Sequence, residues 1–147
     1  MRIAVSACLL GHPCRFDGAA RPCAAVQALA ARHELVPVCP EQLGGLPTPR
    51  PPSEIDAAAP GLRVVDADGA DVTAAFALGA RRTLALVQAE GCELAVLKAK
   101  SPSCGSGLVY DGTFTRTLAA GDGTTVRALR AAGIPVVDET QVEGLLR

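Results

Sequence analysis

The stretch "ELAVLKAKSPSCGSG", Glu93–Gly107, joins a short apolar run to a segment of very different composition. A run of this length, bounded by Gly and Pro residues, is typical of a buried strand. The segment after it contains serines, a proline, glycines and one thiol, Cys104, and such residues form turns rather than core. The pattern predicts a strand that ends abruptly and presents a cysteine just beyond its carboxyl end.

The same pattern occurs twice earlier in the chain. Arg2–Ser6 and Glu34–Val38 are predicted strands, and Cys8 and Cys39 follow them directly. Strands that alternate with helices favour a mostly parallel sheet covered on both faces. We therefore expect an α/β fold, a single-domain three-layer sandwich over residues 1–147, with long cysteine-bearing loops at the carboxyl ends of the strands. Helices are predicted over Pro22–Arg32, Thr73–Glu90, Gly123–Ala132 and from Asp138 to near Arg147. A further strand is predicted over Ile134–Val137.

Three other segments carry local signals. The segment 39–55 is so rich in Pro and Gly that no helix is expected in it before its end. Residues 62–73 are expected to form a hairpin around Asp68-Gly69, and residues 108–114 an extended piece that turns at Asp111-Gly112. The sequence "GDGTT", Gly121–Thr125, precedes a predicted helix and is a weak signal for an anion site at a helix N-terminus.

Composition and charge exclude some classes of protein. The chain of 147 residues is 49% hydrophobic, enough for a core, and its net charge is −1. It has no Lys/Arg block, so a surface that follows a polymeric nucleic acid is not expected. No apolar run approaches the roughly 20 residues that span a bilayer, and the N-terminus lacks a signal-peptide pattern. A cytoplasmic protein without a membrane partner is the expectation.

The six cysteines form no C-x-x-C pair. In a reducing compartment they favour metal binding or catalysis over disulfides. Cys8, Cys39 and Cys104 would meet at one edge of a parallel sheet, where ligands bind in open α/β folds. Three thiolates suit an iron–sulfur cluster with one open vertex, although a three-cysteine zinc site and plain core packing are alternatives. Cys23 and Cys92 are expected to be structural, and Cys14 is left undecided.

Other chemically useful side chains fall in the same loops. Glu41 lies two residues after Cys39 and could move protons in a shared pocket. Ser101 and Ser103 precede Cys104 and could bind a substrate atom or orient water, or simply close a turn. Arg50 could pair with a carbonyl or phosphate group, or cover the surface.

Three long segments resemble one known family. They are "SACLLGHPCRFDG" (6–18), "CPEQLGGLPTPRPPSEI" (39–55) and "LKAKSPSCGSGLVYDGTF" (97–114), and they are similar to the signature segments of the thiouracil desulfidase family. The resemblance implies that Cys8, Cys39 and Cys104 bind a 4Fe-4S cluster with one iron free of protein ligands. It further implies that Glu41 and Ser101 are catalytic.

The implied activity is the non-redox replacement of sulfur by oxygen in a thiolated pyrimidine, with release of hydrogen sulfide. The small-molecule substrate would be 2-thiouracil, 4-thiouracil or a thiouridine nucleotide. Phe16 stands where the family often has Tyr, and with Ser103 and Arg50 it is a candidate for substrate contact. Two alternatives remain open: a non-catalytic protein that binds or senses a cluster or zinc, and a metal-free thiol switch that uses Cys8 and Cys14.

Overall fold

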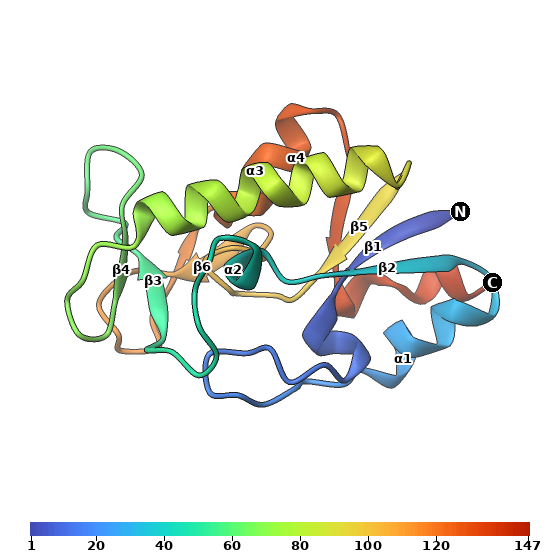
Figure 1. The fold of residues 1–147 in the computed structure, drawn as a ribbon, viewed down its shortest axis with the longest axis horizontal. Helices are drawn as coiled ribbons and strands as arrows, with labels where there is room; N and C mark the ends of the chain where they lie inside the picture. The colour runs from blue at the N-terminus through green and yellow to red at the C-terminus, as the bar shows by residue number, and fades with distance from the viewer.

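The computed structural model describes all 147 residues and is built on a four-stranded sheet (Figure 1). The strands β1 (Arg2–Ser6), β2 (Glu34–Val38), β5 (Leu94–Leu97) and β8 (Val136–Asp138) lie in the order β2-β1-β5-β8, and every pair is parallel. The predicted mostly parallel sheet is confirmed. The bounds of β1 and β2 agree with the prediction, and β8 begins two residues later than expected.

Helices cover both faces of this sheet. The helices α3 (Thr73–Ala89) and α4 (Thr124–Ala131) lie on one face, above the sheet in Figure 1, and α1 (Ala24–Gln27) lies on the other. Side chains alternate between the faces of a strand, so Ala4 packs with Val87 of α3 while Ile3 packs with Val26 of α1. The two resulting cores make the expected three-layer sandwich.

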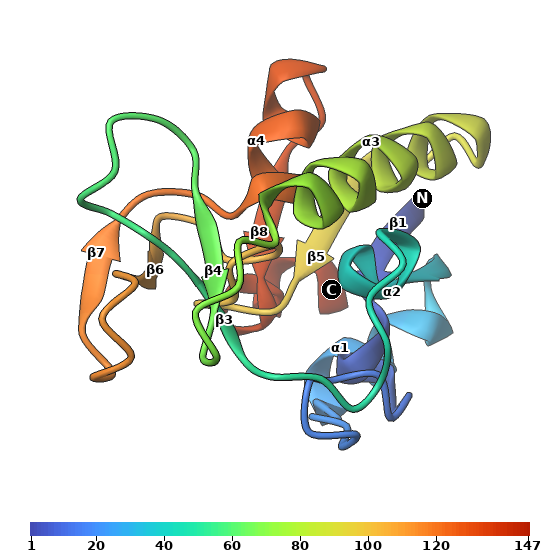
Figure 2. The same cartoon turned by 60° about the vertical axis from the view of Figure 1, so that its left-hand side comes forward.

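Two small hairpins lie beyond the end of the sheet where its strands finish (Figure 2). The strands β3 (Ser53–Ile55) and β4 (Val64–Asp66) form one hairpin, and β6 (Leu108–Tyr110) and β7 (Leu118–Ala120) form the other. They share a third, smaller core made of Ile55, Val64, Phe76 and Val109. The ends of the second hairpin are tied together, because Gly121 N–H donates to Gly107 C=O at 3.0 Å.

Several local predictions were wrong in detail. The segment 39–55 does contain a helix near its start, α2 (Pro40–Leu43), because Pro40 occupies the first helical turn, where proline is tolerated. The predicted helix Pro22–Arg32 is the short α1 followed by the 3₁₀ helix η2 (Ala28–Ala31). The strand β4 pairs with β3 and makes only an isolated bridge, Val65 to Asp71, across the expected turn.

The remaining elements are short 3₁₀ helices. The element η1 (Ala7–Leu10) follows β1, and η3 (Glu139–Gln141) and η4 (Glu143–Leu146) end the chain in place of the expected last helix. Asp138 and Gln141 do form the predicted capping box. None of these helices combines the length and the hydropathy that a membrane span requires.

Candidate functional site

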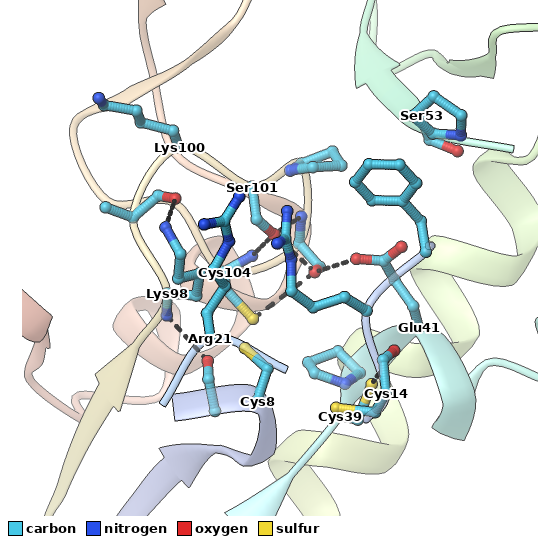
Figure 3. Close-up of a pocket in the computed structure, with 18 of the residues that line it drawn as sticks. Cys8, Cys14, Arg21, Cys39, Glu41, Ser53, Lys98, Lys100, Ser101 and Cys104 are labelled. Carbon is cyan, nitrogen blue, oxygen red and sulfur yellow. Dashed lines mark hydrogen bonds between the residues drawn. The ribbon is translucent and has the colours of Figure 1, made fainter. Parts of the chain in front are cut away.

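The order of the strands opens a crevice at their carboxyl ends. The chain leaves β1 toward β2 but leaves β5 toward β8, so the loops after the two central strands diverge. Cys8 lies in η1 directly after β1, Cys39 follows β2, and Cys104 lies in the loop after β5. All three thiols line one cavity of about 810 Å³, together with Cys14 (Figure 3). The three cysteines therefore meet in one cavity, as predicted, and Cys14 is a fourth thiol there.

The loop that carries Cys104 is held by the helix that follows it. The first N–H groups of α4, on Thr124 and Thr125, donate to the carbonyls of Pro102 and Ser103 at 2.9 and 3.0 Å. These donors are the ones a helix start leaves unpaired. They are used by the loop, so the anion site suggested by "GDGTT" is not formed. A Cβ on Gly123 would lie 2.5 Å from the Ser103 carbonyl, and only glycine permits this approach.

Cys39 and Glu41 are placed by the docking of α2 on α3. Cys39 is the N-cap residue of α2, and Glu41 is in its first turn. The two helices touch backbone to backbone: a Cβ on Gly79 of α3 would lie 2.0 Å from the Pro40 carbonyl oxygen, and one on Gly44 would lie 2.1 Å from that of Ala75. The pair of glycines therefore fixes where the thiol and the carboxyl group face the cavity.

The thiols differ in their surroundings. Burial raises the pKa of Cys104 to about 11, although Ser6 and Ser103 hydrogen-bond its sulfur. The hydrogen bond from Cys14 lowers the pKa of Cys8. Two effects raise the pKa of Cys39: the larger is its hydrogen bond to Cys14, and the smaller is burial. Cys14 is thus hydrogen-bonded to both Cys8 and Cys39.

Glu41 is held at both carboxylate oxygens. Arg50 Nε lies 3.1 Å from Oε1, and Ser103 Oγ donates to Oε2 at 3.1 Å. The Arg50 side chain is 4% exposed, and its other nitrogens donate to the protein, including the Cys14 carbonyl at 3.0 Å. The guanidinium therefore fixes the orientation of the Glu41 carboxylate. Arg50, expected as a substrate contact, is thus occupied in holding the carboxylate and the Cys14 loop.

The remaining predicted residues also lie at the cavity. Ser101, half-buried, and Ser103, 2% exposed, are on the Cys104 loop, and Phe16 also lines the cavity. Arg15 stacks on the Phe16 ring, 5.4 Å from its centroid. Cys23 and Cys92 do not line the cavity, and Cys92 packs in the core beside α3, as expected of structural thiols.

Sequence reasoning missed one contact and one group of residues. Lys98 Nζ pairs with Glu139 Oε2 at 3.1 Å, and Glu139 Oε1 accepts from Ala99 N–H at 2.7 Å, so the C-terminal segment braces the Cys104 loop. No local spacing reveals this contact, because 40 residues separate Ala99 from Glu139. The cavity mouth also carries exposed basic side chains that form no side-chain hydrogen bond or ion pair: Arg21, Lys100 and Arg116.

Comparison with known proteins identifies the family of the chain. Residues 3–141 match the family described as 2-thiouracil desulfurase. A solved structure titled "4Fe-4S-dependent thiouracil desulfidase TudS" is 46% identical with a TM-score of 0.87, over 98% of this chain and 94% of that one. An uncharacterized protein YbbK of Bacillus subtilis (strain 168) is 38% identical over 150 residues, covering 98% of this chain and 99% of the relative. The chain therefore belongs to the 2-thiouracil desulfurase family.

Proposed function

We propose that this protein is an iron–sulfur-dependent desulfidase that replaces the thiocarbonyl sulfur of a thiolated pyrimidine by oxygen and releases hydrogen sulfide. One observation carries the proposal: Cys8, Cys39 and Cys104, from three separate strand ends, line a single cavity with Glu41 and Ser101. The similar solved structure is named as a 4Fe-4S-dependent thiouracil desulfidase, which supports the same chemistry here.

The donor set fits a 4Fe-4S cluster. Thiolate is the usual protein ligand of such clusters, and no histidine lines the cavity. No three His, Cys, Asp or Glu side chains are arranged to hold a single metal ion, and thiols spread around a wide cavity suit a polynuclear core better than one zinc ion. Cys8, Cys39 and Cys104 would hold three of the irons. The fourth iron would stay free of protein ligands, in the cavity that Glu41 and the serines also line.

The side chains of the cavity would have separate roles in the reaction. A cluster held by these cysteines would supply a thiophilic iron that can bind the substrate sulfur and polarise the carbon–sulfur bond. Glu41, held in place by Arg50 and Ser103, accepts a proton as water attacks the thiocarbonyl carbon. Ser101, whose half-buried hydroxyl lines the same cavity, would hydrogen-bond the substrate or the tetrahedral centre that develops there. Water supplies the new oxygen, and no electron donor or acceptor is consumed.

The basic mouth of the cavity favours a phosphorylated substrate. Arg21, Lys100 and Arg116 are exposed and free of ion pairs, and they stand around the opening through which the base would enter. A thiouridine nucleotide could place its base at the cluster and its phosphate among these side chains. We therefore expect the nucleotide to be used more efficiently than the free base.

Anaerobic purification tests the proposal directly. The protein should be brown and carry about four iron and four acid-labile sulfide per chain, as expected of a 4Fe-4S centre. Sulfide release should be measured with 2-thiouracil, 4-thiouracil and 4-thiouridine monophosphate. Replacing Cys8, Cys39 or Cys104 by Ser should lower the iron content, whereas Cys92→Ser is the matched control that should not.

Each possible result is informative. A colourless protein with bound zinc would contradict the cluster. A brown protein that releases no sulfide from any of the three substrates would identify a cluster-binding sensor instead of an enzyme. Retention of full iron content in Cys8→Ser, with loss in Cys14→Ser, would mean that Cys14 is the ligand from this loop.

A further inference from the structure

Aromatic side chains are rare in this chain, and most of them lie at the cavity. The sequence contains three Phe, one Tyr and no Trp. Phe76 is 1% exposed and packs in the core that the two hairpins share, whereas Phe16, Tyr110 and Phe114 all line the cavity. Core packing therefore accounts for only one of the four. Flat apolar faces in a cavity suit a ligand that has a ring of its own.

Phe114 has the most accessible ring of the three. One face of Phe16 is already covered, because the Arg15 guanidinium lies over its ring. No cation is stacked on Phe114, which lies in the turn between β6 and β7 (Figure 2) and is 38% exposed. An aromatic face left open at the edge of a cavity is available to a ligand.

The backbone at Phe114 adopts a conformation that its side chain disfavours. Three residues other than glycine have a positive φ: Lys100 at 70°, Phe114 at 58° and Arg116 at 62°. All three line the cavity. Strain of this kind persists only where the surrounding structure fixes it, and it gathers at functional sites. Phe114 is the one apolar side chain that the fold holds in this way.

Glu54 of β3 is the group that fixes the turn. Its Oε1 accepts from Gly112 N–H at 3.0 Å and from Phe114 N–H at 3.2 Å. The turn also presses on the end of β3, since a Cβ on Gly112 would lie 2.7 Å from the Asp56 Cα. The backbone of Phe114 is therefore in place before a ligand binds, which reduces the entropy lost on binding.

We propose that Phe114 is the platform on which the pyrimidine ring of the substrate stacks and that Glu54 positions it, an inference that rests on the function proposed above. Stacking on an aromatic side chain uses the face of a base and leaves its edges free. The platform therefore accepts the 2-thio and the 4-thio isomer alike, and it disfavours thiocarbonyl compounds without a conjugated ring. Phe114 thus determines the class of substrate, separately from the thiols that hold the cluster.

Binding of the reaction product tests the platform without turnover. Uracil and dihydrouracil carry the same carbonyl and N–H groups, but only uracil has a conjugated, planar ring. In cluster-loaded protein, Phe114→Ala should raise the Kd for uracil about 5- to 150-fold, the range for loss of one base–aromatic stack, and change the Kd for dihydrouracil less than about twofold. Phe114→Tyr keeps the ring and should bind uracil like the wild type. Phe114→Leu keeps only the bulk and should resemble Phe114→Ala.

The matched control is Leu118→Ala. Leu118 lies on the same hairpin and is also 38% exposed, but it does not line the cavity. This variant should keep the wild-type Kd for both ligands, and every variant should keep its iron. An unchanged Kd for uracil in Phe114→Ala, or an equal rise for both ligands, would overturn the platform. Loss of iron in Phe114→Ala would also overturn it, because Phe114 would then be structural.

Phe114→Gly separates the ring from the backbone that carries it. Glycine adopts a positive φ without strain, so this variant should unfold at a higher temperature than Phe114→Ala and bind uracil equally poorly. Wild-type affinity for uracil in Phe114→Gly would overturn the platform. A lower unfolding temperature than that of Phe114→Ala would overturn the argument from backbone strain.

A double-mutant cycle tests whether Glu54 acts through Phe114. Glu54→Ala should raise the Kd for uracil about 2- to 10-fold, since the turn must then be ordered on binding. It should have no further effect in Phe114→Ala, because the two side chains would belong to one device. An equal effect in both backgrounds would overturn the positioning role of Glu54.

Turnover distinguishes the platform from the proposed function. In Phe114→Ala the KM for 2-thiouracil should rise by the same factor as the Kd for uracil, with little change in kcat, because stacking is kept in the transition state. Protein that binds uracil through Phe114 but releases no sulfide would overturn the desulfidase function and leave the platform supported. Sulfide release with the same KM in wild type and Phe114→Ala would overturn the platform and leave the desulfidase function supported.

Discussion

Glu41 illustrates what sequence could and could not predict about single side chains. Its distance of two positions from Cys39 placed it correctly beside the thiols, because a residue so close to a strand end must share the cavity. Its partners were not predictable. Arg50 comes from an irregular loop and Ser103 from a strand exit 62 residues away, and no periodicity relates either one to Glu41.

Replacement of Glu41 by Gln should separate catalysis from cluster binding. Glutamine has the same size and can still accept from Arg50, but it cannot take up a proton. We expect kcat for sulfide release to fall at least about 10²-fold while the iron content and brown colour remain. Glu143→Gln, on the exposed C-terminal segment, is the control. Loss of iron in Glu41→Gln would show that the carboxylate is structural.

Arg50 offers a different test, because its guanidinium joins Glu41 to the Cys14 carbonyl. Lysine cannot make this forked set of bonds, so Arg50→Lys should let the carboxylate move. A displacement of about 1 Å in a catalytic group lowers the rate about 10²-fold, and we expect a fall in kcat of that order. The KM for nucleotide and for free base should change equally. A rise in KM confined to the nucleotide would restore Arg50 as a phosphate contact.

The strands and helices were predicted best where they are long enough to show a repeat or where clear sequence signals mark their ends. The strands β1 and β2 are apolar runs closed by charged residues or loop signals, and their bounds agree with the structure. The helix α2 has only four residues, too few for a helical repeat, and its stability comes from contact with α3. Tertiary contact of this kind leaves no local trace in a sequence.

The contact of α2 with α3 should therefore be sensitive to a single methyl group. In Gly79→Ala the new Cβ would overlap the Pro40 carbonyl oxygen, and α2 must shift. We expect a loss of about 1–3 kcal/mol in the free energy of unfolding, typical of overpacking, and a lower iron content because Cys39 moves. Urea denaturation and iron analysis measure the two effects. Gly144→Ala, where a Cβ meets open space, should show neither, and an unchanged Gly79→Ala would mean that α2 adapts freely.

The molecule as a whole divides into a sheet sandwich and a pair of hairpins. The cores on the two faces of the sheet contain fully buried side chains such as Val5, Val26, Val96 and Leu129, none of which lines the cavity. The fold class and the meeting of the three cysteines followed from the alternation of strands and helices. The packing of the hairpins against each other did not, because their short strands gave no sign of their partners.

Removal of the cluster should abolish activity without unfolding the chain. The cores share Cys8, Cys14 and Cys104 with the cavity, but most of their side chains lie outside it. The protein treated with a chelator and an oxidant should therefore keep its far-UV circular dichroism and a cooperative thermal transition. The transition temperature should be lower than that of the loaded protein, since a bound group stabilises the folded state. Loss of the helical signal on removal would show that the cluster is part of the core.

The basic side chains at the cavity mouth predict a preference for a thiouridine nucleotide over the free base. Arg116→Ala removes one exposed cation of the mouth and leaves the thiols in place. The KM for a thiouridine nucleotide should rise by up to about fivefold, because exposed ion pairs contribute about 0.2–1 kcal/mol, and the KM for the free base should not change. Steady-state kinetics at low salt would show this difference. Equal effects on both substrates would mean that Arg116 does not meet a phosphate.

The tied ends of the β6–β7 hairpin have a consequence for how such enzymes diverge. Gly107 and Gly121 are bonded to each other, so the residues between them leave and rejoin the body of the protein at nearly one point. Tyr110, Phe114 and Arg116 reach the cavity from this segment, while every thiol lies outside it. Natural variation or laboratory grafting could therefore exchange the whole segment as a cassette, and new substrates could be acquired without disturbing the sulfur chemistry.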